Sequence, residues 1–423
     1  MERLPAELID NVADQIDNEE LKSLHQVSRI LNRHTHQAFI KRFFVTRKLD
    51  TSLDCMNQLI NLMRFSPFAS LVQNLVFDTV RQPDDSHLSV KIAEIMKRFA
   101  GRELNSITFV NSASATLMDS GLPPDGRHCN DIARFRNRTR DTNSITRQIL
   151  IPMQLQGIRT RKFSVPGAGR TYGIGCSGLI FFSNFFSSLH HLDIFVYSEN
   201  VHRSEGRDLL VRREASYLAS FINKCPRLSN LKLGTTNQIS VGFPTHLFTN
   251  TLFSSLTNLD LLETVSLTGW QDMTYTTFLS FLTTTPNISR LELVQTSIHA
   301  EGLQKHMGWV IVLRHLLEYH TLTHFSWQRL WAATKWEDYD GNADNTLVGP
   351  PSGLISTHVD ACDKEACVDR VHCRNGVYPR RTVKGRSAVE KTFSCMLANF
   401  ERMKRFDLAE EMGRYDDFED TEV

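Results

Sequence analysis

No stretch of this sequence is a long apolar run of the length that a helix needs to cross a membrane. An excess of either charge is also missing, because 48 Lys and Arg residues face 47 Asp and Glu residues, which gives a net charge of +1. Such a balance provides no global attraction to nucleic acid or to anionic lipid. We therefore expect neither a membrane nor a nucleic acid as a partner.

Strings typical of catalytic sites are absent as well. The sequence contains no Gly-x-Ser-x-Gly elbow, no His-Glu-x-x-His metal motif and no phosphate-binding P-loop. We therefore expect a protein that is not an enzyme and that carries no cofactor.

Cysteines follow no paired spacing. The eight cysteines are at positions 55, 129, 176, 225, 362, 367, 373 and 395. A scatter of this kind is typical of reduced thiols, so we expect a location in the cytoplasm or the nucleus. Cys362, Cys367 and Cys373, with His358 and His372 nearby, could ligate zinc. Their spacing is not the compact Cys-x-x-Cys of structural sites, so we favour free thiols and predict no metal.

The first 45 residues show apolar residues mostly three to five positions apart, which indicates short helices with one apolar face. Pro5 suits the first turn of a helix, and Asn18, followed by two glutamates, suits the cap of a second one. Three short helices bury little surface on their own. We therefore expect some of the apolar residues in this segment to await a partner.

Two strings in this segment resemble the F-box family. They are Leu4-Pro5-Ala6-Glu7 and Leu21-Lys22-Ser23-Leu24-His25-Gln26-Val27-Ser28-Arg29, which match the family's Leu-Pro-x-Glu opening and its later Leu-x-x-Leu-x-x-Val-Ser-Arg string. The resemblance implies docking on a Skp-type adaptor within a cullin complex. The adaptor contacts that it implies are Leu4, Pro5, Leu8, Leu21, Leu24, Val27 and Ser28. Because the pattern begins near Met1, we expect no signal peptide. An ordinary helical cap on a larger domain is the alternative.

Beyond Arg47 a second pattern, apolar-x-x-apolar-x-apolar, recurs along the chain. It occurs at 72–77, 104–109, 189–194, 228–233, 256–261, 288–293 and 322–327. From Leu192 onward its central residues are roughly 28 to 39 positions apart, and repetition at such a period indicates a repeat array. We predict a short strand at each occurrence.

The segments between these strands have helical patterns that end at a proline turn, as at Cys225-Pro226 and Thr285-Pro286. A unit of helix, turn, strand and loop resembles the irregular leucine-rich repeats attached to many F-box proteins. The resemblance implies a solenoid, in which the units stack into a curved parallel sheet with helices outside. An ordinary α/β domain with alternating strands and helices is the alternative.

The predicted fold is therefore α/β, with an N-terminal three-helix F-box followed by an irregular leucine-rich-repeat solenoid. The expected segments are an F-box-like domain at 1–45, a solenoid at 46–336 with an insertion near 111–143, a polar insertion or linker at 337–387, a terminal repeat or capping helix at 388–414, and an acidic tail at 415–423.

Gly173 to Gly178 match the dinucleotide-binding string Gly-x-Gly-x-x-Gly, and Asp193 lies near the distance expected of a ribose-binding acid. The segment before the first glycine is itself rich in glycine rather than a strand, and 179–188 is a poor helix. We therefore favour a loop between repeats over nucleotide binding.

A leucine-rich-repeat sheet exposes the residues between its core positions, and here they are polar and mixed in charge. They are His190, His191, Asp193, Asn230, Lys232, Asn258, Asp260, Arg290, Glu292, His324 and Ser326. Such a surface suits protein recognition better than a small apolar ligand, unless its residues are simply solvated.

Together these expectations describe the substrate-recognition subunit of an SCF-type cullin-RING ubiquitin ligase, with its repeats binding an unknown protein substrate. The alternative is a non-catalytic interaction scaffold that acts outside ubiquitination, and an enzyme ranks third.

Overall fold

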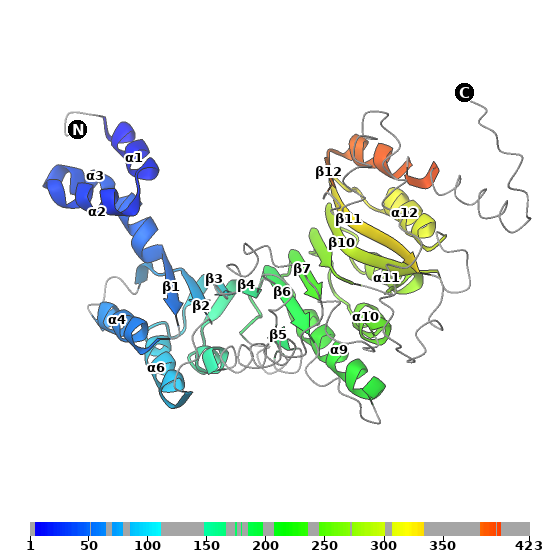
Figure 1. The fold of residues 1–423 in the computed structure, drawn as a ribbon, viewed down its shortest axis with the longest axis horizontal. Coiled ribbons are helices and arrows are strands. Elements are labelled where there is room, and N and C mark those ends of the chain that lie inside the picture. Colours follow the sequence, from blue (N-terminus) through cyan, green and yellow to red (C-terminus); the bar gives the residue numbers. More distant parts are fainter. Residues whose placement is uncertain are drawn as a thin grey trace, which may run out of the picture. The chain divides into compact units, whose positions relative to one another are not determined.

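The computed structural model shows an α/β fold in which N-terminal helices precede a mostly parallel sheet with accompanying helices (Figure 1). It describes residues 5–50, 52–64, 70–78, 85–110, 148–165, 174–175, 179, 185–197, 207–235, 245–270, 273–300, 307–333, 381–394 and 396–398. The chain divides into two units, one of Met1–Ile174 and Phe181–Ile194, the other of Gly175–Ile180 and Phe195–Val423. The predicted α/β class is confirmed.

Three short helices open the first unit, as the apolar spacing predicted. They are α1 (Ala6–Gln15), α2 (Asn18–Val27) and α3 (Arg29–Ile40), and the π-helical turn η1 (Lys41–Val45) follows them. Pro5 precedes α1, where the missing N–H of proline costs no hydrogen bond. The Pro5 carbonyl accepts hydrogen bonds from the amides of Leu8 and Ile9, which starts the helix.

The starts of α2 and α3 are capped by side chains. The Glu20 amide donates to Asp17 Oδ1 at 2.8 Å, and the Asp17 amide donates to Glu20 Oε2 at 3.1 Å, which makes a reciprocal capping box. Ser28 Oγ accepts from the Leu31 amide at 3.2 Å. The prediction that Asn18 caps α2 is wrong, because only Asp17 has a glutamate three positions later that can return the bond.

The core that these helices share is small. Ala13, Leu21 and Ala38 are buried in it, with Ile16, Phe39 and Phe43 packed against them, and Ile9 and Leu31 are buried as well. Arg42 ties η1 to the end of α1 by donating to the backbone carbonyls of Asp14 and Ile16. Because the three helices are short, they remove little apolar surface from water, and they gain limited stability from packing on one another.

The described strands of the first unit run parallel, each beside the next in chain order. They are β1 (Thr46–Asp50), β2 (Asn74–Asp78), β3 (Glu103–Val110), β4 (Arg159–Val165) and the first part of β6 (His191–Tyr197). Their register aligns Leu75 with Ile107, Ile107 with Phe163, and Phe163 with Leu192. All four side chains are buried, so the apolar pattern of the sequence becomes one continuous row.

Aromatic rings reinforce this row. Phe77 stacks on Phe109 with 5.4 Å between the ring centroids, and Phe109 meets the edge of Phe163 at 5.9 Å. Phe163 in turn meets the edge of Phe186 at 4.9 Å. All of these rings are buried, so each of the strands β2, β3 and β4 contributes an aromatic side chain to a single packed layer.

The second unit contains the remaining part of β6 from Phe195 onward and the strands that follow it. These are β7 (Asn230–Thr235), β8 (Thr264–Thr268), β10 (Arg290–His299), β11 (His324–Ala333) and the antiparallel β12 (Arg381–Lys384). Two short strands lie off this path: β5 (Ile174–Gly175) pairs with β6, and β9 (Met273–Thr274) with β10. The buried residues Leu231, Val265, Leu291 and Phe325 are aligned.

Helices connect the strands and run beside one another along the sheet (Figure 1). They include α4 (Leu53–Arg64), α6 (Asp85–Lys97), α9 (Arg207–Asn223), α10 (Thr245–Ser254), α11 (Tyr275–Thr283) and α12 (Met307–Tyr319), and residues 148–155 are helical as well. Alternate strand residues are buried, as in β3 and β7, and the residues between them are partly or fully exposed. The sheet therefore has one apolar side and one polar side.

One predicted strand is misplaced. The pattern at 256–261 predicted a strand, but these residues form a turn, and the strand is β8. Asn258 has a φ of 58°, which a strand does not tolerate, and Leu256, Leu259 and Leu262 are buried by the turn itself. The apolar spacing therefore predicted correctly that these leucines are buried, but it predicted a strand where the backbone forms a turn.

The end of the described chain also departs from expectation. β12 lies inside 337–387, which was predicted as a polar insertion or linker; its short Arg-Thr-Val-Lys run holds a single apolar residue and gives no strand signal. Residues 386–394 and 396–398 are helical, and Val389, Phe393 and Met396 are buried. Phe393 meets the edge of Phe325 at 4.8 Å, which packs this helix on β11.

Several predicted segments lie outside the described residues. They are the insertion at 111–143, residues 337–380 of the polar insertion, the stretch from 399 to 414, and the acidic tail.

We expect Phe163→Ala to lower the free energy of unfolding by about 3–5 kcal/mol, because the substitution leaves a cavity between Phe109 and Phe186. Lys162→Ala, on the exposed side of the same strand, serves as the matched control and should cost well under about 1 kcal/mol. Denaturant unfolding of the three proteins measures both values, and equal losses for the two variants would contradict the aromatic layer.

Candidate binding surfaces

The N-terminal helices keep large apolar side chains in contact with water. Leu8 on α1 is 48% exposed, Val27 at the end of α2 is 70% exposed and Ile30 at the start of α3 is 50% exposed. Pro5 is exposed as well. We call Leu8, Val27 and Ile30 the N-terminal apolar surface. Each of the three helices thus contributes one side chain that its own small core does not cover.

The other residues predicted to bind an adaptor have different positions. Leu21 is fully buried in the helical core, so it has no surface to offer a partner. Leu24 is half-buried, and Ser28 caps α3. Leu4 lies outside the described residues. Sequence reasoning missed Ile30. Its neighbour Leu31 is buried, and adjacent residues of a helix point in different directions, so Ile30 is exposed.

On the polar side of the first unit, short side chains are hydrogen-bonded across the strands. Asn74 Nδ2 donates to Thr46 Oγ1 at 3.2 Å, and Ser106 Oγ donates to Asn74 Oδ1 at 2.8 Å. The register continues this row through Lys162 and His191. Much of the hydrogen-bonding capacity of β1, β2 and β3 on this side is therefore used within the protein.

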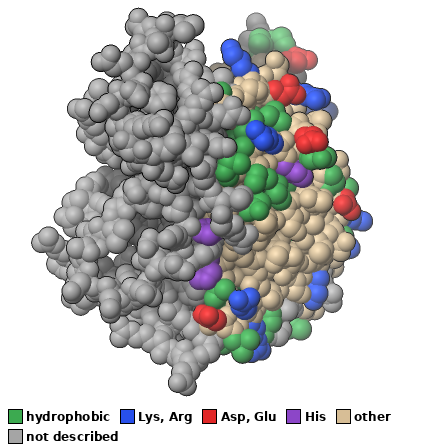
Figure 2. Space-filling model, turned by 90° about the vertical axis from the view of Figure 1, so that its right-hand side faces the viewer, with side chains coloured by type: hydrophobic (Ala, Val, Ile, Leu, Met, Phe, Trp, Pro, Cys, Tyr) green, Lys and Arg blue, Asp and Glu red, His purple; other side chains and the backbone are tan. Residues whose placement is uncertain are grey.

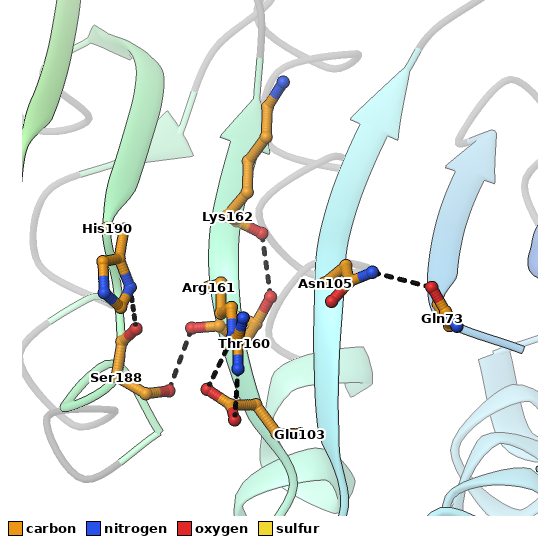
Figure 3. Close-up of polar contacts among 8 residues, drawn as sticks. All are labelled: Gln73, Glu103, Asn105, Thr160, Arg161, Lys162, Ser188 and His190. Carbon is orange, nitrogen blue, oxygen red and sulfur yellow. Dashed lines mark hydrogen bonds and ion pairs between the residues drawn. The ribbon is translucent and has the colours of Figure 1, made fainter.

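A second set of polar contacts joins the starts of these strands (Figure 3). Asn105 Nδ2 donates to Gln73 Oε1 at 2.8 Å. Arg161 donates from Nη2 to Glu103 Oε2 at 3.4 Å, with its Nε at 3.3 Å from Oε1. This hydrogen bond lowers the pKa of Glu103, and the positive charge of the guanidinium lowers it further. Adjacent strands are thus joined by side chains as well as by the backbone.

The two predicted histidines of this region differ in role. His190 Nδ1 lies 2.8 Å from the Ser188 carbonyl, so its ring is held against the backbone of its own turn (Figure 3). His191 is exposed at the start of β6, beside Lys162 in the register. Burial lowers the pKa of His191, and the positive charges of Lys162 and His190 lower it further. At neutral pH, His191 is an uncharged donor and acceptor.

Asp193 follows two residues later on the same side of β6, half-buried and aligned with Ser164. The structure therefore brings His191, Asp193 and Lys162 together on neighbouring strands, while it gives His190 a local structural contact.

On the polar side of the second unit, the register arranges the strand residues in two rows. The first row is Asn230, Thr264, Arg290, His324 and Lys384, and the second is Lys232, Ser266, Glu292, Ser326 and Thr382. Ser326 Oγ and Thr382 Oγ1 are 3.0 Å apart, which joins β11 to β12. Six of the predicted recognition residues of this unit share this side of the sheet. Ser326 is fully buried, which corrects its prediction as an exposed residue.

Asn258 and Asp260 are absent from these rows, which corrects their prediction as residues of the sheet surface. Both are exposed in the turn before β8, where the Asp260 carbonyl accepts a hydrogen bond from Asn287 Nδ2 at 2.6 Å. Thr264 and Ser266 take their places on the sheet. Thr264 and Ser266, which sequence reasoning missed, lie after Leu262 in an alternating Thr-Val-Ser-Leu-Thr run. This alternation was the signal in the sequence that could have indicated the strand.

An aromatic ring also lies on this side of the second unit. A Cβ added to Gly234 on β7 would be 2.2 Å from Phe195 Cδ2 and 2.5 Å from its Cε2. Phe195 on β6 is half-buried, so its ring covers the glycine and is partly open to solvent. Glycine is required at this position because the ring occupies the space of a side chain.

Two histidines near the end of α12 are enclosed without hydrogen bonds. His320 is buried, its ring centroid is 5.5 Å from that of His315, and neither of its ring nitrogens has a partner. His315 Nε2 is likewise buried and without a partner. Burial lowers the pKa of His320 to about 4, with a further contribution from His315. His320 is therefore uncharged at neutral pH.

The structure describes little of the glycine string that resembles a nucleotide site and none of the possible zinc ligands at 358–373. Ile174 and Gly175 form β5 instead of leading into a helix, and the other residues of the glycine string lie outside the described residues. Cys362, Cys367, Cys373, His358 and His372 also lie outside them. Within the described ranges, no group of three His, Cys, Asp or Glu side chains could hold a metal ion. Cys225 is buried, and burial raises the pKa of its thiol to about 12.

The surface view in Figure 2 is consistent with the balanced composition of the chain. A group of described hydrophobic side chains lies near the middle of this view, others are scattered toward its top, right edge and bottom, and Lys, Arg, Asp and Glu side chains are interspersed among them. Of the helices in the described ranges, none is both long and apolar enough to cross a membrane.

The chain matches none of the protein-family models and none of the curated proteins to which it was compared.

We expect Gly234→Ala to destabilise the protein by about 1–3 kcal/mol, because the new methyl group would clash with the Phe195 ring. Phe195→Ala in the same chain removes the ring and should recover part of the loss. Thermal unfolding of both single variants and the double variant measures the coupling. Strictly additive losses would show that the ring and the glycine do not interact.

The protein should become less stable as the pH falls, and part of this loss should depend on His320. Unfolding moves its pKa from about 4 to the ordinary value of 6.5, so the unfolded chain binds a proton that the folded chain does not. This contribution is complete above pH 6.5 and is lost as the pH falls toward 4, with a magnitude on the order of 1–3 kcal/mol.

His320→Phe should flatten this part of the pH profile without lowering stability at pH 7. His34→Gln, which replaces a half-buried histidine of α3, is the control and should leave the slope unchanged. Calorimetric unfolding at several pH values compares the three proteins, and a parallel profile for His320→Phe would refute the assignment.

Proposed function

We propose that this protein is the substrate-recognition subunit of an SCF-type ubiquitin ligase, with an F-box made by α1, α2 and α3. The observation that carries the proposal is the N-terminal apolar surface. Leu8 directly follows the first of the two strings that resemble the F-box, Val27 belongs to the second, and both are exposed on short helices with a small shared core. Covering such side chains with a partner removes apolar area from water and favours association.

The exposed residues also define which part of the F-box pattern would meet the adaptor. Leu8, Val27 and the neighbouring Pro5 are available for contact, and Leu24 is partly so. Leu21 and Ser28 instead build the helices, one as a core residue and the other as a cap. In this proposal the docking residues are Pro5, Leu8, Leu24 and Val27, with Ile30 added.

We further propose that the strands and helices beyond Thr46 form an irregular leucine-rich-repeat solenoid. Support comes from the register, which places equivalent apolar residues of successive units beside one another, as in Leu231, Val265 and Leu291. Each unit buries its apolar side against the next, which is the principle of a repeat array. The polar side of the sheet is then the surface that holds the target protein.

The role assigned to the chain is positioning and not bond chemistry. By holding a target and an adaptor on one molecule, it raises the effective concentration of the target near a ubiquitin-loaded enzyme. Free thiols are in keeping with a reducing compartment such as the cytoplasm or the nucleus, and Cys225 is a free thiol in the described part of the chain. No cofactor is needed for this role.

The double variant Leu8→Asp/Val27→Lys tests the docking surface. We expect it to weaken binding to a purified Skp-type adaptor at least about tenfold, because each buried side chain of this size contributes about 1.5–3 kcal/mol. The acidic residue near the start of α1 and the basic residue at the end of α2 suit the helix dipoles, so the fold should persist. Titration calorimetry measures the affinity.

Val90→Asp/Leu155→Lys is the matched control, because both residues are similarly exposed apolar side chains elsewhere in the first unit, at 64% and 76%. It should bind the adaptor as the unchanged chain does. Undiminished binding by Leu8→Asp/Val27→Lys would reject the docking surface. If the adaptor binds but captured proteins are neither ubiquitinated nor accumulate when the chain is deleted, the protein is a scaffold outside ubiquitination.

A further inference from the structure

Two histidine rings meet where α12 ends, and their nitrogens are buried without hydrogen bonds. His320 is 7% exposed, and neither of its ring nitrogens has a partner. Nε2 of His315 is buried and has none either. A buried nitrogen that forms no hydrogen bond costs free energy, so three such atoms in one place call for a ligand that satisfies them.

Earlier turns between a helix and a strand of the second unit satisfy their buried polar side chain internally. In the turn between α9 and β7, the Cys225 thiol donates to the Phe221 carbonyl at 3.4 Å. In the turn between α11 and β10, the Thr285 hydroxyl donates to the Phe281 carbonyl at 3.0 Å. His320 lies in the turn between α12 and β11, and within the described part of the chain its ring makes no such bond. Its ring is therefore available to bind a ligand.

The spacing of the two rings matches that of two imidazoles on one metal ion. A zinc ion lies about 2.0–2.1 Å from each imidazole nitrogen, with tetrahedral angles between its ligands, so the centroids of two bound rings are roughly 5 Å apart. The centroids of His315 and His320 are 5.5 Å apart, and their planes are inclined by 57°. The rings of His25 and His36 lie 5.9 Å apart but are stacked nearly parallel, at 16°, so they present faces to each other and not nitrogens.

The surroundings of the pair suit a cation. Burial lowers the pKa of His315, and the negative charge of Glu318 opposes that shift, so a carboxylate acts on the pair. The Tyr319 ring lies 4.7 Å from the His315 ring, and the His315 side chain is only half-buried, which leaves a route of entry. Among the described residues no third His, Cys, Asp or Glu side chain completes the set, so water takes the remaining positions of the ion.

We propose that His315 and His320 bind a divalent transition metal ion of the zinc type. Imidazole is a preferred ligand of such ions, and one nitrogen of each neutral ring binds the ion while the other carries the proton. Because His315 belongs to α12 and His320 to the turn before β11, the ion fastens the helix to the turn that leads into the strand. The site does not depend on the proposed function, since neither residue belongs to the N-terminal apolar surface.

Titration of the full chain with Zn²⁺ tests the proposal. A chelator first frees the chain of metal, which is the state to which the pH profile of His320 also refers. Calorimetry then measures Zn²⁺ binding, and thermal unfolding measures its effect on stability. Zn²⁺ at about 100 times its dissociation constant should raise the unfolding midpoint on the order of 5 °C, because the ion binds only the folded pair. Mg²⁺ at the same concentration should leave the midpoint unchanged, because it prefers oxygen ligands.

Substitutions locate the ion. His315→Gln should weaken Zn²⁺ binding at this site at least about tenfold, since even the loss of an outer partner of a metal ligand costs that much. His320→Phe, which keeps an aromatic ring in the buried position, should do the same. His25→Gln/His36→Gln removes the stacked pair, serves as the matched control and should keep the full rise in the midpoint. Each variant is compared with itself before Zn²⁺ is added, and every variant keeps all of its cysteines, so the differences report the two histidines.

Two results would overturn the proposal. If His315→Gln and His320→Phe bind Zn²⁺ and gain stability from it as the unchanged chain does, the ion lies elsewhere. If the control variant loses as much of the rise as they do, the effect comes from histidines in general and not from this pair. Because no adaptor is present in the assay, either result leaves the docking of the N-terminal helices untouched.

Discussion

The alignment of apolar side chains on consecutive parallel strands is the interaction on which the rest of the described structure depends. Leu75, Ile107 and Phe163 follow one another in the register of the first unit, and Leu231, Val265 and Leu291 do so in the second. No single strand can cover its own apolar side, so each one gains stability only when its neighbours are present. The aromatic layer and the accompanying helices follow from the same need.

One-sided burial also leaves the opposite side of the sheet polar in both units. The two units use that side differently. In the first, Asn74 and Ser106 bond to neighbours across the strands. In the second, Arg290 and Lys384 remain without partners within the described residues.

Six of the seven predicted strands begin within two residues of a described strand, because period-two burial is a local property of a sequence. The strand at 256–261 was not, since a turn with Asn258 at positive φ buries leucines at the same spacing as a strand. β12 was missed because an edge strand with one apolar residue has no period to detect. Of the predicted surface residues, Leu21, Asn258 and Asp260 have positions that local pattern could not resolve.

The sequence by itself determined that this protein has three short N-terminal helices and a chain of apolar strands separated by helices, because apolar spacing reports which side chains avoid water. Only the tertiary structure decided which of those side chains remain exposed and which polar residues share a surface. Leu8 and Leu21 look alike in sequence, yet one is open to solvent and the other is buried. The physical reason is that burial and strand register depend on contacts between segments far apart in the chain, and such contacts leave no local periodicity.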